Sequence, residues 1–178
     1  MLGSVYLVAA GAFLGLLFLG AAIHKFADLG HFAAVLESQR LLPLWGRKVA
    51  VIVLPLLELG LGVGLLMEAT RAPAGLAAAG LLALYGVVLA IGARRGAHAD
   101  DCGCSLFGAR PPSNTLVWRN GILVILALGV AMVEKTVVLP AMAWGNALAA
   151  GGAFFVLYTA LEALAATRAR IVATEARA

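Results

Sequence analysis

The sequence predicts an all-α protein, a polytopic bundle of membrane-spanning helices. Hydrophobic residues make up 63% of the chain and charged residues 12%, whereas charged residues make up about 25% of an ordinary soluble domain. The mean hydropathy is correspondingly high, at +1.00. The apolar residues also gather into stretches of about 20, which is the length of helix that crosses a hydrocarbon core about 30 Å thick.

Five such stretches follow one another along the chain. The predicted spans cover residues 5–23, 49–67, 74–93, 116–133 and 147–166. The first precedes the first basic residue, Lys25, so it is predicted to be a retained helix and not a secretory signal, which begins with positive charge. Residues 24–47 are expected to form a helix along the membrane surface that ends at Pro43, and residues 68–73 a short turn. Residues 1–178 are thus predicted to form one integral membrane domain.

The basic residues predict an orientation, because excess positive charge stays on the cytoplasmic side. With five spans, 11 of the 13 lysines and arginines fall on one side of the membrane. They are Lys25, Arg40, Arg47, Lys48, Arg94, Arg95, Arg110, Arg119, Arg168, Arg170 and Arg177. Only Arg71 and Lys135 fall on the other. We therefore expect a bacterial cytoplasmic (inner) membrane protein with its N-terminus outside and residues 94–115 and the C-terminus in the cytoplasm. The same imbalance explains the net charge of +4 without a nucleic-acid partner.

Both cysteines of the chain, Cys102 and Cys104, lie in the polar segment 94–115 and are one glycine apart. A disulfide that closes so short a loop stabilises a fold little, and its strained ring is easily reduced. Gly103 lets the backbone bend so that both sulfurs face one reactant. The pattern favours a redox-active pair over a structural disulfide or two unrelated free cysteines. It does not say which cysteine attacks.

The same pair allows two other kinds of protein. Two thiolates suit soft metal ions such as Cu(I), Hg(II) or Zn(II), so one alternative is a metal-binding membrane transporter or chaperone. Because a four-ligand site needs more than two cysteines, His98, and otherwise His24 or His31, would have to help. The second alternative is a non-catalytic structural membrane subunit that functions without either thiol.

Polar residues within or beside the predicted spans are the next candidates. Glu58 is expected about nine residues, or about 13 Å, inside its span and near the bilayer midplane, where a carboxylate is read as functional by default. It could handle protons, or be a protonated or paired structural residue. His24, Lys25 and Arg119 fall at the membrane edge of the cysteines. For Lys25 and Arg119 the alternative interpretation is snorkelling to lipid headgroups. For His24 it is an interfacial hydrogen bond. The Arg119 guanidinium could hold a thiolate or a quinone oxygen through its fixed donors.

Four segments in a fixed order carry a resemblance to a known family. They read HKFADLGHFAAVLESQRLLP, LPLLELGLGVGLL, DCGCSLFG and WRNGILVILAL. This combination, over residues 5–133, resembles the MauE family of methylamine-utilisation proteins and the related DoxX-type redox-associated membrane proteins. The resemblance implies a four-helix DoxX/MauE-like core with a fifth, C-terminal transmembrane helix. It also implies a role in disulfide formation in exported proteins, with a thioredoxin-like partner outside the membrane.

Carried over by position, the resemblance marks Cys102 and Cys104 as the catalytic redox pair. It also marks five supporting polar residues, which are His24, Lys25, Glu58, Arg119 and Asn120. The chain departs from the family pattern where Ser105 and Leu106 separate Cys104 from Phe107. The predicted function is that of a membrane thiol-disulfide oxidoreductase, or of its accessory. It would relay electrons between a thioredoxin-like partner and either a membrane quinone or a thiol on the other face. Direction of electron flow and oligomeric state stay open.

Overall fold

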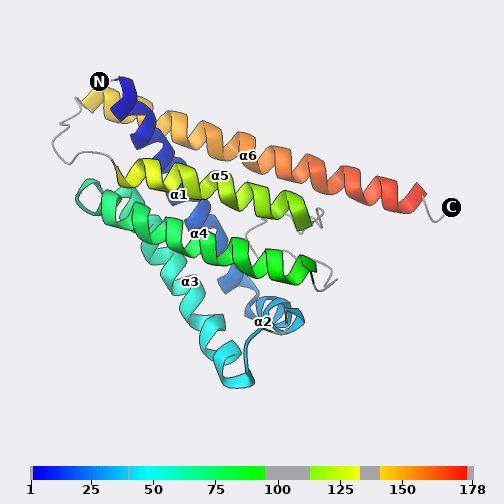
Figure 1. Ribbon diagram of the computed structural model, residues 1–178. Helices are drawn as coiled ribbons and strands as arrows, with labels where there is room; N and C mark the ends of the chain where they lie inside the picture. The colour runs from blue at the N-terminus through cyan, green and yellow to red at the C-terminus, as the bar shows by residue number, and fades with distance from the viewer. Residues whose placement is uncertain (1, 40, 95–112, 133–140, 176–178) are drawn as a thin grey trace.

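The computed structural model describes residues 2–39, 41–94, 113–132 and 141–175 (Figure 1). These residues form α-helices, one short 3-10 helix and no strand. The elements are α1 (Leu2–Ala27), α2 (Leu29–Ser38), α3 (Leu44–Leu66), η1 (Glu68–Thr70), α4 (Arg71–Arg94), α5 (Ser113–Ala131) and α6 (Ala141–Glu175). Helices α1, α3, α4 and α6 are long and apolar enough to cross a membrane, and α5 holds a shorter apolar stretch, Leu116–Ala131. The prediction of an all-α, multi-pass membrane bundle is confirmed.

The first connection differs from its prediction. Helix α1 continues to Ala27, so His24 and Lys25 belong to it and not to a surface segment. A separate helix, α2, then begins after Asp28, whose carboxylate accepts a hydrogen bond from the His31 amide at 2.8 Å and caps the helix. Pro43 was expected to end this helix and instead immediately precedes α3. A proline is tolerated there because the first amides of a helix have no partner within it.

The later connections differ as well. The predicted turn at residues 68–73 is taken up by η1 and by the start of α4, so that Pro73 lies in the first turn of α4, a position that suits proline. Helix α6 continues well beyond the predicted span, to Glu175. The five predicted spans overlap α1, α3, α4, α5 and α6 in order. The assignment of the whole chain to one domain stays a prediction.

Helix α1 is central to the bundle. It packs against α2, α3, α5 and α6, while α4 packs along α5 and also contacts α3. The main core joins apolar side chains of these helices, among them Phe13, Leu14, Phe18, Leu65, Leu82, Leu123, Ala127 and Val130. Large apolar side chains also cover the outer faces, such as Ile125 on α5 and Leu164 on α6, which are 72% and 67% exposed. An exposed apolar surface of this kind suits contact with lipid.

The ends of the helices alternate between two ends of the bundle. Figure 1 shows the N-terminus beside the start of α6, while the end of α4, the start of α5 and the C-terminal end of α6 lie at the opposite end. The segment that carries the cysteines therefore connects α4 to α5 at the same end of the bundle as the C-terminal end of α6. The orientation predicted from the basic residues assumes this alternation of helix directions.

Glycines set the distance between α1 and α3. A Cβ atom on Gly62 would lie 2.7 Å from Cγ of Leu19 and 3.0 Å from the carbonyl oxygen of Gly15. Small residues at such crossings let transmembrane backbones approach closely. Gly60, two residues earlier on α3, would meet nothing within 4 Å. The two glycines of one helix therefore differ sharply in the space that surrounds them.

This difference predicts unequal effects of alanine on stability. Gly62→Ala should lower the free energy of unfolding by about 1–3 kcal/mol, because the added methyl group overpacks the crossing. Gly60→Ala should leave it unchanged or slightly raised, because alanine is the better helix former. Unfolding in mixed detergent micelles, followed by circular dichroism, measures both. Equal effects at the two positions would contradict the crossing described here.

Candidate functional site

A buried polar cluster joins three helices inside the bundle. The Lys25 ammonium of α1 donates to Oε1 of Glu58 of α3 at 2.5 Å, and the Tyr85 hydroxyl of α4 donates to the same oxygen at 2.7 Å. Lys25 and Glu58 are 1% and 0% exposed, and Tyr85 is 5% exposed. We call these three residues the Glu58 cluster. It brings together two residues that the sequence singled out and one that it did not.

The surroundings of the Glu58 cluster explain why both charges are retained. A charge in apolar surroundings is strongly disfavoured unless an opposite charge and hydrogen bonds compensate it. Lys25 supplies the opposite charge and Tyr85 the further hydrogen bond. The Lys25 ammonium also lies 5.3 Å from the ring centre of Phe32 on α2 and 5.5 Å from that of Tyr85, within the range of cation–π attraction. Lys25 is therefore held inside the protein and does not snorkel to lipid headgroups.

A second cluster of the same chemical kind joins α5 to α6. The Arg119 guanidinium donates to Oε1 of Glu162 at 2.6 Å, and the Tyr158 hydroxyl donates to that oxygen at 2.7 Å. Arg119 and Glu162 are each 14% exposed, so this Glu162 cluster is less deeply buried than the first. Arg119, like Lys25, pairs with a carboxylate on a neighbouring helix. The sequence analysis considered the Arg119 guanidinium as a donor to a thiolate or a quinone oxygen. In the structure this guanidinium pairs with Glu162.

The two clusters share one detail of geometry. In each, a cation and a tyrosine donate to one carboxylate oxygen, while the other, Oε2 of Glu58 or of Glu162, is buried and accepts no hydrogen bond within the described chain. A buried carboxylate oxygen without a donor is unusual, because nearly all buried polar atoms are partnered. Each cluster therefore keeps a buried acceptor for a proton or a further donor. This is the chemical capacity that the two sites have in common.

The remaining predicted residues lie in different places. Asn120 is 1% exposed and its amide donates to the carbonyl oxygen of Leu116 at 3.2 Å. Its Cβ faces α4 at Gly86, beside Tyr85, where an added Cβ would lie 3.7 Å away. His24 is half-buried near the end of α1. Asn120 thus packs against α4 at the residue that follows Tyr85 in the sequence, whereas Arg119 belongs to the Glu162 cluster.

The cysteines and the predicted metal ligand lie elsewhere in the chain. Cys102, Cys104 and His98 are outside the described residues. Among the residues that are described, no three histidine, aspartate, glutamate or cysteine side chains come close enough to hold a metal ion. The redox pair and the metal alternative therefore stay predictions.

Sequence reasoning missed three members of these clusters, Tyr85, Tyr158 and Glu162. Glu162 could have been found by the argument that singled out Glu58, because it too is a carboxylate inside a predicted span, residues 147–166. The tyrosines carried no comparable signal, since tyrosine is common in apolar helices and its hydroxyl partner depends on packing. Tyr85 and Glu58 are 27 residues apart in the chain.

The fold and these clusters define a class: a polytopic helical membrane protein with cation–carboxylate–tyrosine clusters buried between its helices. Comparison with known proteins narrows the class. The family model described as Methylamine utilisation protein MauE matches residues 3–133. The chain belongs to the MauE family. The resemblance found in the sequence is confirmed, while the relation to DoxX-type proteins stays a prediction.

Curated relatives support the same assignment. The methylamine utilization protein MauE of Paracoccus denitrificans is 41% identical over 120 residues, which cover 67% of this chain and 64% of the relative. That of Methylorubrum extorquens is 40% identical over 67% of this chain and 65% of the relative. This chain thus spans slightly under two thirds of these two relatives. The MauE of Paracoccus versutus is 36% identical over 91% of this chain and 88% of the relative. No solved structure matches the chain.

The geometry of the Glu58 cluster predicts the effect of removing one hydroxyl. Tyr85→Phe should lower the free energy of unfolding by about 1.5–3 kcal/mol, the contribution of a hydrogen bond to a charged group. Tyr6→Phe is the matched control, because Tyr6 is 70% exposed on α1. It should change the free energy by less than about 0.5 kcal/mol. Chemical unfolding in mixed micelles compares the two. A neutral Tyr85→Phe would show that the hydroxyl does not stabilise Glu58.

Proposed function

We propose that this protein is a membrane thiol-disulfide oxidoreductase, or the membrane accessory of one, that exchanges disulfides with a thioredoxin-like partner. The observation that carries the proposal is the Cys102-Gly103-Cys104 sequence between α4 and α5. Two thiols one residue apart suit reversible oxidation better than structural cross-linking. In the oxidising direction, the protein supplies disulfides for the maturation of exported proteins.

The proposed exchange passes through a mixed disulfide. A thiolate of the partner attacks one sulfur of the Cys102–Cys104 disulfide, which breaks that bond and releases the other cysteine as a thiolate. The second partner thiolate then attacks the partner sulfur of the mixed disulfide, leaving the partner with a disulfide and this protein with two thiols. Two electrons pass from the partner to the Cys102–Cys104 pair. The reverse sequence reduces the partner through the same intermediate.

The described helices support this proposal by fixing both ends of the cysteine segment. Helix α4 ends at Arg94 and α5 begins at Ser113, and the two helices pack along their length. Tyr85 of the Glu58 cluster is nine residues before Arg94, about 13 Å along a helix. The segment that holds the thiols therefore begins and ends on helices that carry buried polar groups near that end of the bundle.

The count of basic residues supports a cytoplasmic position for the pair. We propose a bacterial cytoplasmic membrane as the location, with Cys102, Cys104 and the C-terminus on the cytoplasmic side. The thioredoxin-like partner implied by the family acts outside the membrane. The pair would then receive or deliver electrons in the cytoplasm and reach the outer face through a conformational change, as alternating-access carriers do. The relatives are named for methylamine utilization, which makes the exported proteins of such a system the favoured clients.

The redox state of Cys102 and Cys104 in growing cells tests the proposed exchange. Cells are quenched in acid, free thiols are alkylated, and the mass of the protein is compared with and without prior reduction. We expect a substantial oxidised fraction that shifts when a thioredoxin-like partner is deleted. Cys102→Ser and Cys104→Ser serve as matched controls, because neither can form the internal disulfide. One of the two should accumulate a mixed disulfide, since its resolving thiol is missing.

A pair that stays fully reduced under all these conditions would contradict the proposal and leave the metal-binding and structural alternatives. The same labelling, done before lysis with a membrane-impermeant maleimide, tests the orientation. We expect the reduced thiols to be protected in intact cells and labelled after permeabilisation. Labelling in intact cells would show that the charge count fails and that the pair meets its partner directly on the outside.

A further inference from the structure

Two neighbouring hollows on the surface of the bundle differ in polarity. The first, which we call the polar groove, has a volume of about 430 Å³ and is lined by Glu37, Ser38, Leu42 and Arg47. The second, which we call the apolar pocket, has a volume of about 210 Å³ and lies between α2, α3 and α4. Leu42 lines both of them. The polar groove and the apolar pocket therefore adjoin one another across a single side chain.

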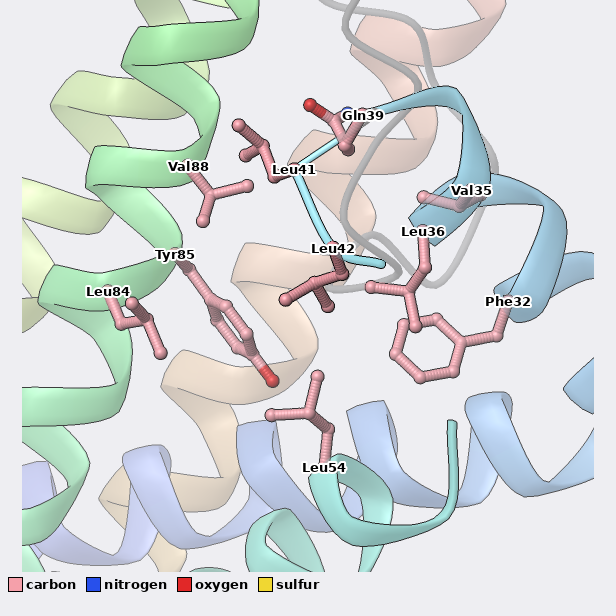
Figure 2. Close-up of a pocket in the computed structure, with 10 residues that line it drawn as sticks. All are labelled: Phe32, Val35, Leu36, Gln39, Leu41, Leu42, Leu54, Leu84, Tyr85 and Val88. Atoms are coloured by element: carbon pink, nitrogen blue, oxygen red, sulfur yellow. The ribbon is translucent and has the colours of Figure 1, made fainter. Parts of the chain in front are cut away.

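The apolar pocket extends deeper into the bundle than the polar groove. Figure 2 shows Leu42 between Leu36 of α2 and Tyr85 of α4, with Leu54 of α3 beside them. Leu54 follows Arg47 by seven residues of α3, which is about 10 Å along a helix. Leu42 is 42% exposed, so the pocket is open at the surface of the bundle. A hydrocarbon chain that enters beside the start of α3 would bury its surface against these side chains.

The polar groove carries charges of both signs. Nη1 of Arg47 lies 2.7 Å from Oε1 of Glu37, and their side chains are 21% and 70% exposed. A guanidinium has five N–H donors, so this pair leaves donors of Arg47 for a phosphate. Lys48, the next residue of α3, is exposed and lines a third hollow together with Glu37 and Arg47. A phosphate would therefore meet two cations, while an ammonium group beside it would meet the Glu37 carboxylate.

Apolar side chains also border these charges in the third hollow. Its volume is about 390 Å³, and Leu44, Val51 and Ile52 of α3 line it beside Lys48. Trp45, at the start of the same helix, is 73% exposed, and exposed tryptophans are enriched at the level of the lipid headgroups. The charged side chains thus lie at headgroup depth and have apolar surface in both adjoining hollows. This layout suits a lipid with two acyl chains.

The two signs of charge distinguish between headgroups. Phosphatidylglycerol carries a phosphate and no cation, so it would bring a second anion beside Glu37. Phosphatidylcholine has a cation without an N–H group, so it cannot donate a hydrogen bond to the carboxylate. Phosphatidylethanolamine has a phosphate and a primary ammonium group with three N–H donors, as lysine has. Only the last of these headgroups can pair with the cations and donate to Glu37 at the same time.

We propose that the polar groove binds the headgroup of one phosphatidylethanolamine molecule, one acyl chain of which occupies the apolar pocket. The phosphate lies against Arg47 and Lys48, and the ammonium group lies against Glu37. The lipid thereby connects the end of α2 to the start of α3 and to α4. This inference goes beyond the proposed function and does not depend on it, because the site consists of described residues and includes no cysteine.

Native mass spectrometry of the full chain tests the choice of lipid. The delipidated protein in detergent is titrated with phosphatidylethanolamine, phosphatidylglycerol or phosphatidylcholine of identical acyl chains. We expect one phosphatidylethanolamine to bind at least about twofold more tightly than either other lipid, the effect of one exposed ion pair. Glycerophosphoethanolamine, the same headgroup without chains, should not compete at equal concentration. No preference for phosphatidylethanolamine, or full competition by the headgroup alone, would overturn the proposal.

A substitution of Glu37 tests the orientation of the headgroup. Glu37→Gln removes the negative charge and keeps the shape of the side chain. Phosphatidylethanolamine should then bind about two- to fivefold less tightly, and phosphatidylglycerol more tightly. Glu68→Gln is the matched control, because Glu68 is an exposed glutamate that follows the far end of α3. An order of affinities that stays the same in Glu37→Gln would overturn the proposal.

Two neighbouring valines of α4 test the place of the acyl chain. Val88 lines the apolar pocket, so Val88→Phe should fill it and weaken the binding of phosphatidylethanolamine about fourfold for each methylene group that it displaces. Val87→Phe is the matched control, because Val87 is 55% exposed and is not part of the lining. Equal affinities of the two variants would show that no acyl chain occupies the pocket. That result would leave the proposed thiol exchange intact.

Discussion

The ion pair between Lys25 and Glu58 is the interaction on which the rest of the structure depends. A lone charge in apolar surroundings is strongly disfavoured, so each of these side chains constrains the helix that carries the other. The pair joins the end of α1 to the interior of α3, and the Tyr85 hydroxyl adds α4 to the same oxygen. Gly15 and Gly62 permit the close crossing of α1 and α3. Packing and electrostatics thus set the same arrangement.

This arrangement brings polar and aromatic side chains together toward one end of the bundle. Helix α2 covers Lys25 with the Phe32 ring, and the same ring lines the apolar pocket that Tyr85 borders from α4 (Figure 2). The helix that contributes Tyr85 ends at Arg94, where the cysteine segment begins. The Glu58 cluster therefore includes a side chain of the helix that leads into the cysteine segment. The Glu162 cluster links α5 to α6 by the same chemistry, while α6 packs mainly against α1.

The sequence predicted much of the fold and part of the site. Long apolar stretches predict helices by their length, so the order of the long helices in the described residues followed from the sequence, although the apolar stretch of α5 is shorter than a span. Glu58 was found because a carboxylate inside a span is rare. Its partners could not be predicted, because Lys25 and Glu58 are 33 residues apart and only packing brings them together. Pro43 was misread because a proline suits the start of a helix as well as the position after its end.

The measurement that tests the central claim most directly is a double-mutant cycle on Lys25 and Glu58. The free energy of unfolding is measured for Lys25→Met, Glu58→Met and the double variant. Each single change should cost about 3–5 kcal/mol, because it leaves a buried charge unpaired. The double variant should cost no more than either, giving a large interaction energy. Additive effects, with a double variant as destabilised as the two single variants together, would show that the pair does not hold α1 and α3 in place.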